Sequence, residues 1–277
     1  ETGLEVQRQA YDTGVNILAI QEGTTNPERW IVLSAHYDTI APTADQPVGI
    51  GPTIYGAWDD GSGTATLMEL AQTLGQGEFP FTVVYAFFDG EEKGLRGSAA
   101  FVEKMLDTEG VELVANLNMD PPGLNWPCGD QAGPFPVKII HEMEKVEAGE
   151  LPRYAWLHQA VEHALAETGV PDEVRDYTAG IPVASTAVTG VTGTSDHASF
   201  GRLDIANVFI GGTPSTIVGG DPNDHLVAGM TYPLHTPLDT LEAMEARCLT
   251  GSLVEGLQTT VDIMAHALTW MAANPAP

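Results

Sequence analysis

The stretch FTVVYAFFDGEEKGLRGS, residues 81–98, decides the fold class. Its first part, FTVVYAFF, is a continuous apolar run rich in β-branched and aromatic side chains, which predicts a buried strand. A glycine-containing loop follows, and SAAFVEKMLDTEG (98–110) then predicts a helix for which Ser98 is the expected N-cap. A buried strand followed by a loop and a helix is typical of an α/β protein.

The same alternation continues on both sides of this stretch. Further strands are expected at 111–119 and 205–212, and at 15–21 and 30–36 as a hairpin or two neighbouring strands. Further helices are expected at 62–75, 137–146, 151–169 and 247–273. We therefore predict a single domain over residues 1–277, a three-layer αβα sandwich around a mixed, mostly parallel sheet.

Composition and charge exclude several classes of partner. The chain has 11 Lys and Arg against 38 Asp and Glu, for a net charge of −27. That field repels nucleic acid and anionic lipid surfaces, and no apolar run is long enough to predict a membrane span. The start ETGLEVQRQ has neither a Met nor a signal region, so we expect a trimmed chain. With only four lysines, we expect a secreted or extracellular protein.

Polar side chains gather where the expected strands end. In an open α/β sheet, ligands bind beyond the carboxyl ends of the strands. Residues of metal-binding type occur there or in neighbouring loops: His36, Asp38, Asp59, Asp60, Glu91, Glu92, Asp120, His235 and Asp239. We expect one edge of the sheet to collect them.

Each of these motifs has a simpler interpretation when taken alone. An H-x-D is more often a hydrogen-bonded loop, DDGSG (59–63) can cap a helix, and two adjacent glutamates are usually solvated. Together, two histidines and several carboxylates without cysteine have the composition of a two-metal site. The count fits His36 with Asp120, His235 with Glu92, and Asp59 between the metals. Asp38 then takes the other ring N–H of His36.

Two other patterns carry less weight. Ser195, Asp196 and His197 are consecutive and cannot assemble a serine-hydrolase relay, and no G-x-S-x-G is present. The segment HQAVEH (158–163) has the wrong spacing for a metal motif and predicts a solvated helix face. Cys128 and Cys248 lie too far apart in the sequence for a C-x-x-C site, and their pairing stays open.

The series HYDT, GAWDDGSG, EEKGLRGS, NMDPPG, TSDHASF and HTPLDT resembles, in content, order and spacing, peptidase family M28, a family of zinc aminopeptidases. The resemblance covers residues 15–240 and implies two zinc ions per chain. One zinc is held by His36 and Asp120, the other by Glu92 and His235, and Asp59 bridges them. Residues 118–123 fit N-x-D-x-x-G, so Asp120 rather than Asn118 takes the ligand position. The resemblance assigns Glu91 as the general base.

The resemblance also implies what surrounds the metals. Asp196 and His197 line the site, and residues 124–194 shape the substrate pocket. Many relatives have a tyrosine directly before the late histidine; here Leu234 stands there, so Tyr232 or Arg202 is the candidate oxyanion donor. The expected substrate is a peptide with a free N-terminus, and the expected state is a monomer. Two alternatives within the fold are a single-zinc aminoacyltransferase similar to glutaminyl cyclase and a receptor-like binding domain without catalysis.

Overall fold

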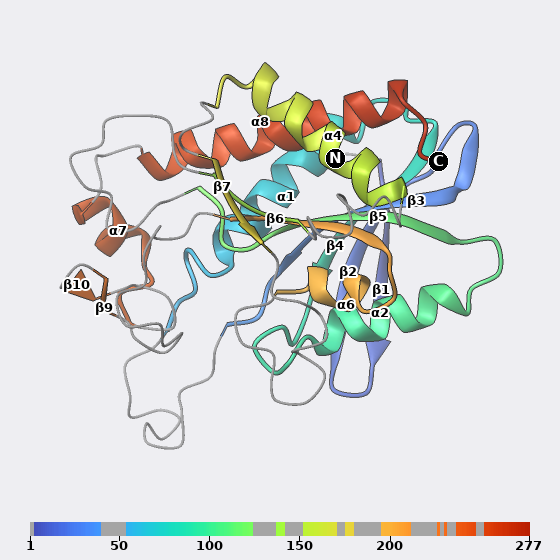
Figure 1. Cartoon of the computed structure of the whole chain (residues 1–277). Helices are drawn as coiled ribbons and strands as arrows, with labels where there is room; N and C mark the ends of the chain where they lie inside the picture. The colour runs from blue at the N-terminus through green and yellow to red at the C-terminus, as the bar shows by residue number, and fades with distance from the viewer. Residues whose placement is uncertain are drawn as a thin grey trace.

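The computed structural model describes residues 3–39, 54–123, 137–141, 152–170, 175–179, 195–211, 226–227, 230–231, 237–247 and 252–277. These residues form an eight-stranded mixed sheet in the order β1-β2-β4-β3-β5-β8-β6-β7 (Figure 1). The strands are β1 (Glu5–Tyr11), β2 (Gly14–Gln21), β3 (Asn26–His36), β4 (Phe81–Phe88), β5 (Glu112–Met119), β6 (Val137–His141), β7 (Arg175–Ala179) and β8 (Ala206–Gly211). A separate pair consists of β9 (Leu226–Val227) and β10 (Met230–Thr231).

The middle of the sheet is parallel and its flanks are mixed. Strands β4, β3, β5 and β8 run in the same direction. On one side β2 joins β4 in antiparallel fashion and β1 joins β2 as a hairpin. On the other side β6 is antiparallel to β8. The carboxyl ends of the four parallel strands therefore meet at one edge.

Helices cover both faces of the sheet (Figure 1). One face carries α1 (Gly61–Leu74), α4 (Pro152–Glu167) and α8 (Ser252–Ala273), and the other carries α2 (Arg96–Leu106) and α6 (His197–Gly201). A short helix, α7 (Leu241–Arg247), lies to one side. This arrangement confirms the predicted three-layer αβα fold. In the described ranges, no helix has the length and apolar composition needed to cross a bilayer.

The apolar side chains of β4 pack into two hydrophobic cores, one on each face of the sheet. Val83 and Tyr85 belong to the cluster under α1, α4 and α8, whereas Val84 and Ala86 belong to the cluster under α2 and α6. Successive side chains of a strand point to opposite faces, so a strand covered on both sides must be apolar at every position. This is why residues 81–88 lack the polar alternation of a half-exposed strand.

The helix expected at 137–146 is wrong over residues 137–141. These residues form β6, which pairs with β8 and β7. The segment Val-Lys-Ile-Ile-His is rich in β-branched residues, and its five-residue length suits a strand that completes a sheet. Residues 142–146 lie outside the described ranges. The expected helix at 151–169 is present as α4.

Two further expectations need correction. Strands β2 and β3 are not neighbours, because β4 lies between them. The loop joining β2 to β3 therefore crosses the start of β4. Ser98 does not cap α2, which begins at Arg96 after Leu95; the Ser98 hydroxyl instead donates to the Leu95 carbonyl and pairs with the Ser199 hydroxyl.

Candidate metal centre

Five of the predicted site residues, all within the described ranges, lie at the carboxyl edge of the parallel strands. His36 is the last residue of β3, and Asp120 directly follows β5. Asp59 lies two residues before α1, and the loop with Glu91 and Glu92 follows β4. Three strand ends and one helix start therefore supply these side chains. This is the position at which open α/β sheets bind ligands.

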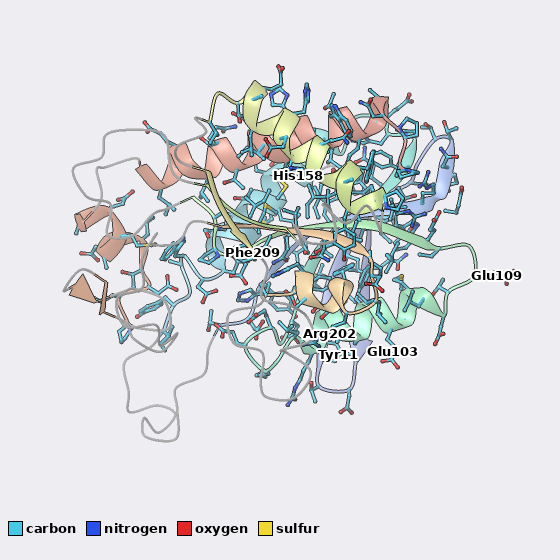
Figure 2. The ribbon with its side chains drawn as sticks, in the orientation of Figure 1. Tyr11, Glu103, Glu109, His158, Arg202 and Phe209 are labelled. Carbon is cyan, nitrogen blue, oxygen red and sulfur yellow. The ribbon has the colours of Figure 1, made fainter. Side chains whose placement is uncertain are left out.

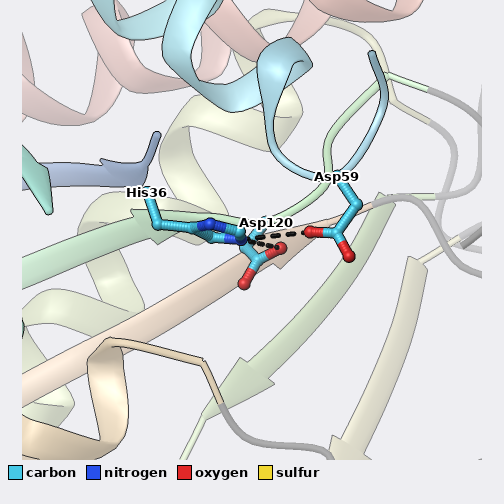
Figure 3. A group of neighbouring side chains, drawn as sticks. All are labelled: His36, Asp59 and Asp120. Carbon is cyan, nitrogen blue, oxygen red and sulfur yellow. Dashed lines mark hydrogen bonds and ion pairs between the residues drawn. The ribbon is translucent and has the colours of Figure 1, made fainter. Parts of the chain in front are cut away.

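Three of these side chains form a compact, buried group (Figure 3). The Nε2 atom of His36 lies 3.0 Å from Asp59 Oδ1 and 3.5 Å from Asp120 Oδ1. One potential ligand atom from each residue lies within 4.8 Å of the other two. An imidazole nitrogen and two carboxylate oxygens are a donor set that suits zinc.

The other side of the His36 ring is held by Asp38, through a different atom than expected. The closest contact of Nδ1 is the Asp38 backbone oxygen at 3.0 Å, and the nearer Asp38 carboxylate oxygen is at 3.5 Å. That carboxylate instead accepts the backbone N–H of Glu91 at 3.0 Å. Asp38 thus orients the His36 ring and anchors the glutamate loop at the same time.

The adjacent aspartates Asp59 and Asp60 have separate tasks. Asp60 is buried; its carboxylate accepts the Gly63 N–H at the start of α1 and the backbone N–H of His36. The chain just before Asp60 is fixed by Asp239, because the Asp239 carboxylate accepts the backbone N–H groups of Trp58 and Asp59. Asp60 is therefore a helix cap, while the Asp59 carboxylate faces the His36 ring.

A row of buried polar groups, which the sequence interpretation missed, leads to Asp120. The Ser34 hydroxyl donates to Asn118 Oδ1 at 2.6 Å, and Asn118 Nδ2 donates to Ser195 Oγ at 2.7 Å. The Ser195 hydroxyl in turn hydrogen-bonds to Asp120. Asn118 therefore points along the sheet and not to the metal group. The available signal was the polar residues inside otherwise apolar strands, Ser34 in VLSAH and Asn118 in NLNM.

The electrostatics of the group call for a cation. Burial raises the pKa of Asp60 and of Asp120 above the usual range, and in each case neighbouring carboxylates add to the effect. Burial alone would lower the pKa of His36, but the charge of Asp120 and hydrogen bonds to the surrounding aspartates raise it well above normal. Carboxylates that cannot easily share one buried space become stable when a metal ion neutralises them.

Glu91 and Glu92 are both partly buried beside this group. Burial raises the pKa of Glu91, and the charge of Asp120 raises it further. The backbone oxygen of Glu91 accepts N–H groups from Gly94 and Leu95, so the loop is a closed turn. Among the described residues, the three-membered group contains His36, Asp59 and Asp120, and Glu92 is outside it. His235, the expected partner of Glu92, lies outside the described residues.

The remaining predicted residues divide into three sets. Asp196 and His197 are buried at the start of α6, and their place in the lining of the site stays a prediction. Burial raises the pKa of Asp196 to about 7 and lowers that of His197 to about 4. Arg202 has an exposed side chain at the end of α6 (Figure 2). Tyr232, Leu234, Cys128 and Cys248 lie outside the described residues, so the oxyanion donor stays a prediction and the cysteine pairing stays open.

Neither of the two patterns that carried less weight forms the site that it superficially resembles among the described residues. The Ser195 hydroxyl is engaged with Asn118 and Asp120, and no relay to His197 forms among the described side chains. His158 lies on α4 in the helix layer (Figure 2), and His163 is exposed on the same helix.

Comparison with known proteins agrees with this geometry. Residues 16–251 match the model of peptidase family M28. A probable zinc metalloprotease of Pyrenophora tritici-repentis is 31% identical over 148 residues, which are 50% of this chain and 30% of that protein. The fold is similar to that of a zinc aminopeptidase from Bacillus subtilis, with a TM-score of 0.58, 20% identity, and coverage of 93% of this chain and 50% of that one. A glutaminyl cyclase from Porphyromonas gingivalis gives a TM-score of 0.59 at 22% identity, covering 95% of this chain and 84% of that one.

The chain is an α/β protein with a candidate metal site at the carboxyl edge of its sheet, and it belongs to peptidase family M28. It spans less than a third of the length of the curated fungal relative that it matches.

We expect the stability of the metal-free chain to fall as pH rises from about 6.5 to about 8. Asp196 has an ordinary pKa of 3.8 and a pKa of about 7 in the fold, so the folded state holds a proton that the unfolded state has lost. The other shifted carboxyls of the site act in the same direction. His197 acts in the opposite direction, but only below its ordinary pKa of 6.5. The measurement is the Tm of chelator-treated protein, with Asp196→Asn as the variant expected to flatten the slope. A Tm that rises over this window would contradict the electrostatic account.

Replacing each of the two adjacent aspartates with asparagine should affect a different property: zinc binding for Asp59 and stability for Asp60. Asp59→Asn removes a charge that faces the His36 ring, so we expect zinc binding to weaken strongly with little change in the Tm of the metal-free chain. The Asp60 carboxylate accepts two backbone N–H groups, whereas the amide of Asp60→Asn can accept only one and places its own NH2 group against the other. We therefore expect Asp60→Asn to lower the free energy of unfolding by about 1–3 kcal/mol. Zinc titration and chemical denaturation of both variants separate these effects. Equal loss of zinc in both would contradict the division of roles.

Proposed function

We propose that this chain is a zinc aminopeptidase that uses two metal ions to remove the N-terminal residue from peptides. The observation that carries the proposal is the buried group of His36, Asp59 and Asp120 at the sheet edge, next to a loop with two glutamates. Membership of peptidase family M28 and the likeness to a zinc aminopeptidase support the same assignment.

The residues would divide two zinc ions between them. His36 and Asp120 would hold one ion, Glu92 and His235 the other, and Asp59 would contribute to both. The described residues supply buried nitrogen and oxygen donors and a local excess of negative charge, which fit zinc. When bound, zinc lowers the pKa of water at the site towards about 7 and polarises the substrate carbonyl.

Glu91 is the proposed general base. Its loop is anchored through its own N–H to Asp38, so the carboxyl has a fixed origin beside the metal group. Burial and the charge of Asp120 raise its pKa, which favours a carboxyl that can hold a proton near neutral pH. Glu91 would take a proton from the attacking water and give it to the departing amine.

The charge of the site supports the proposed restriction to the N-terminus. Buried carboxylates outnumber the positive groups among the described residues around His36. A free amino group can bind a metal or a carboxylate there, while an acetylated one has lost its basic lone pair and its charge. We therefore assign peptides with unblocked N-termini as substrates.

A second candidate is a single-zinc aminoacyltransferase similar to glutaminyl cyclase. The observation that favours it is the fold likeness to the bacterial cyclase, of which this chain covers the larger share. The two functions separate on a peptide with N-terminal glutamine: an aminopeptidase releases free glutamine, while a cyclase releases ammonia and leaves the peptide bond intact. A third candidate, a receptor-like binding domain, would bind no zinc and convert no substrate.

Replacing each of the two glutamates with glutamine should affect a different property of the enzyme. Glu91→Gln keeps the size of the side chain but cannot accept a proton, so kcat should fall by about 10²-fold or more while both zinc ions stay bound. Glu92→Gln removes the charge of a proposed ligand, so zinc content and activity should fall together. Zinc content and steady-state kinetics on an aminoacyl substrate give both results.

The N-acetylated form of the same substrate is the control and should resist cleavage. Zinc loss confined to Glu91→Gln would reverse the two roles. Equal cleavage of the acetylated and free substrates would contradict the aminopeptidase assignment.

A further inference from the structure

The glutamate loop is held from outside the metal centre by the N-terminal β1–β2 hairpin. Because β2 is antiparallel to β4, the first residues of β2 run past the carboxyl end of β4 and reach the loop that follows it. The backbone oxygen of Asp89 accepts the Tyr11 hydroxyl at 2.9 Å, and its carboxylate accepts the Val15 N–H at 2.9 Å. Burial, with the charge of Asp89, raises the pKa of Tyr11 to about 12, so this hydroxyl stays a donor.

Asn16 joins the two ends of the loop. It is fully buried on β2, and its Oδ1 accepts the Asp89 N–H at 3.1 Å. Its Nδ2 donates to the Gly97 backbone oxygen at 2.8 Å and to Gln9 Oε1 at 2.8 Å. One amide side chain therefore fixes residue 89 before the glutamate pair and residue 97 after it.

The hairpin and the glutamate loop lie so close together that Gly14 and Gly97 have no room for a side chain. A Cβ on Gly97 would lie 2.2 Å from the Asp89 backbone oxygen and 2.3 Å from Asn16 Oδ1. A Cβ on Gly14 would lie 1.9 Å from Asp89 Oδ2. Glycine at both positions lets the hairpin and the loop approach within hydrogen-bonding distance.

We propose that Asn16, supported by Tyr11, is a positioning residue that sets where the Glu91 carboxyl lies relative to the metal group. The inference rests on the function proposed for Glu91. Between the two points fixed by Asn16, the Glu91 N–H donates to Asp38, which also contacts His36. The hairpin and the His36 ring are therefore connected to Glu91 through short hydrogen bonds on both sides. A general base tolerates little displacement, since an error of about 1 Å can cost about 10²-fold in rate.

Gln21 supplies a matched control on the same strand. Like Asn16 it is a buried amide with three hydrogen bonds, to the Leu74 and Gly77 backbone oxygens and from the Tyr85 hydroxyl. These partners lie at the opposite end of β2, next to the end of α1. Asn16→Ala and Gln21→Ala thus remove the same kind of network from the two ends of one strand, and only the first touches the glutamate loop.

The test compares the zinc-loaded parent, Asn16→Ala, Gln21→Ala and the milder Tyr11→Phe. In Asn16→Ala we expect faster hydrogen exchange over residues 89–97 and a kcat lower by about 10-fold to 10²-fold, with KM and zinc content close to those of the parent. Tyr11→Phe should show both effects to a smaller extent. Gln21→Ala should have a lower Tm than the parent, but the same kcat and the same exchange rates over residues 89–97.

Equal exchange in the glutamate loop and equal kcat for Asn16→Ala and Gln21→Ala would overturn the inference. If Asn16→Ala does not fold, Tyr11→Phe decides, because it removes one hydroxyl only: unchanged exchange and kcat there would also overturn it. A parent that cuts no aminoacyl substrate would contradict the proposed function instead, and the exchange comparison would still decide whether Asn16 orders the loop.

Discussion

The concentration of negative charge at the carboxyl edge of the sheet is the constraint on which the rest of the structure depends. Asp59 and Asp120 are buried against the His36 imidazole and Asp60 is buried beside them, and burial raises the pKa of Asp60 and of Asp120. A fold does not gather such groups for stability, because a hydrophobic cluster of the same volume is usually at least as stable. A bound cation resolves the conflict, and the imidazole and carboxylate donors favour zinc.

The surrounding architecture keeps these acids apart and in order. Backbone N–H groups hold several of them: Asp60 caps α1, Asp239 holds the chain at Asp59, and Asp38 accepts the N–H of Glu91. A carboxylate that accepts N–H groups keeps a fixed orientation even when its neighbours are negative. The β1–β2 hairpin adds a second support from the flank of the sheet. The metal centre is thus fixed by the backbone of at least four segments that are distant in sequence.

The sequence predicted the layers and the proximity of His36, Asp59 and Asp120, because both depend on local patterns. His36 and Asp120 end strands whose apolar runs are plain, and Asp59 precedes a helix with clear periodicity. The strand at 137–141 was not predicted from the sequence. A short run of β-branched residues forms a strand here because it pairs with β8. The contact between Asn16 and residues 89–97 was also missed. It joins segments that are more than 70 residues apart, and only the antiparallel register of β2 on β4 brings them together. The sequence assigned the Asp38 carboxylate to the His36 ring, whereas the backbone oxygen of Asp38 makes the closer contact.

The measurement that tests the central claim most directly is anomalous scattering from crystals grown with zinc, recorded on both sides of the zinc absorption edge. The account predicts two zinc peaks about 3.5–4 Å apart, one beside His36 and Asp120 and both next to Asp59. A single peak, or peaks away from His36, would contradict it.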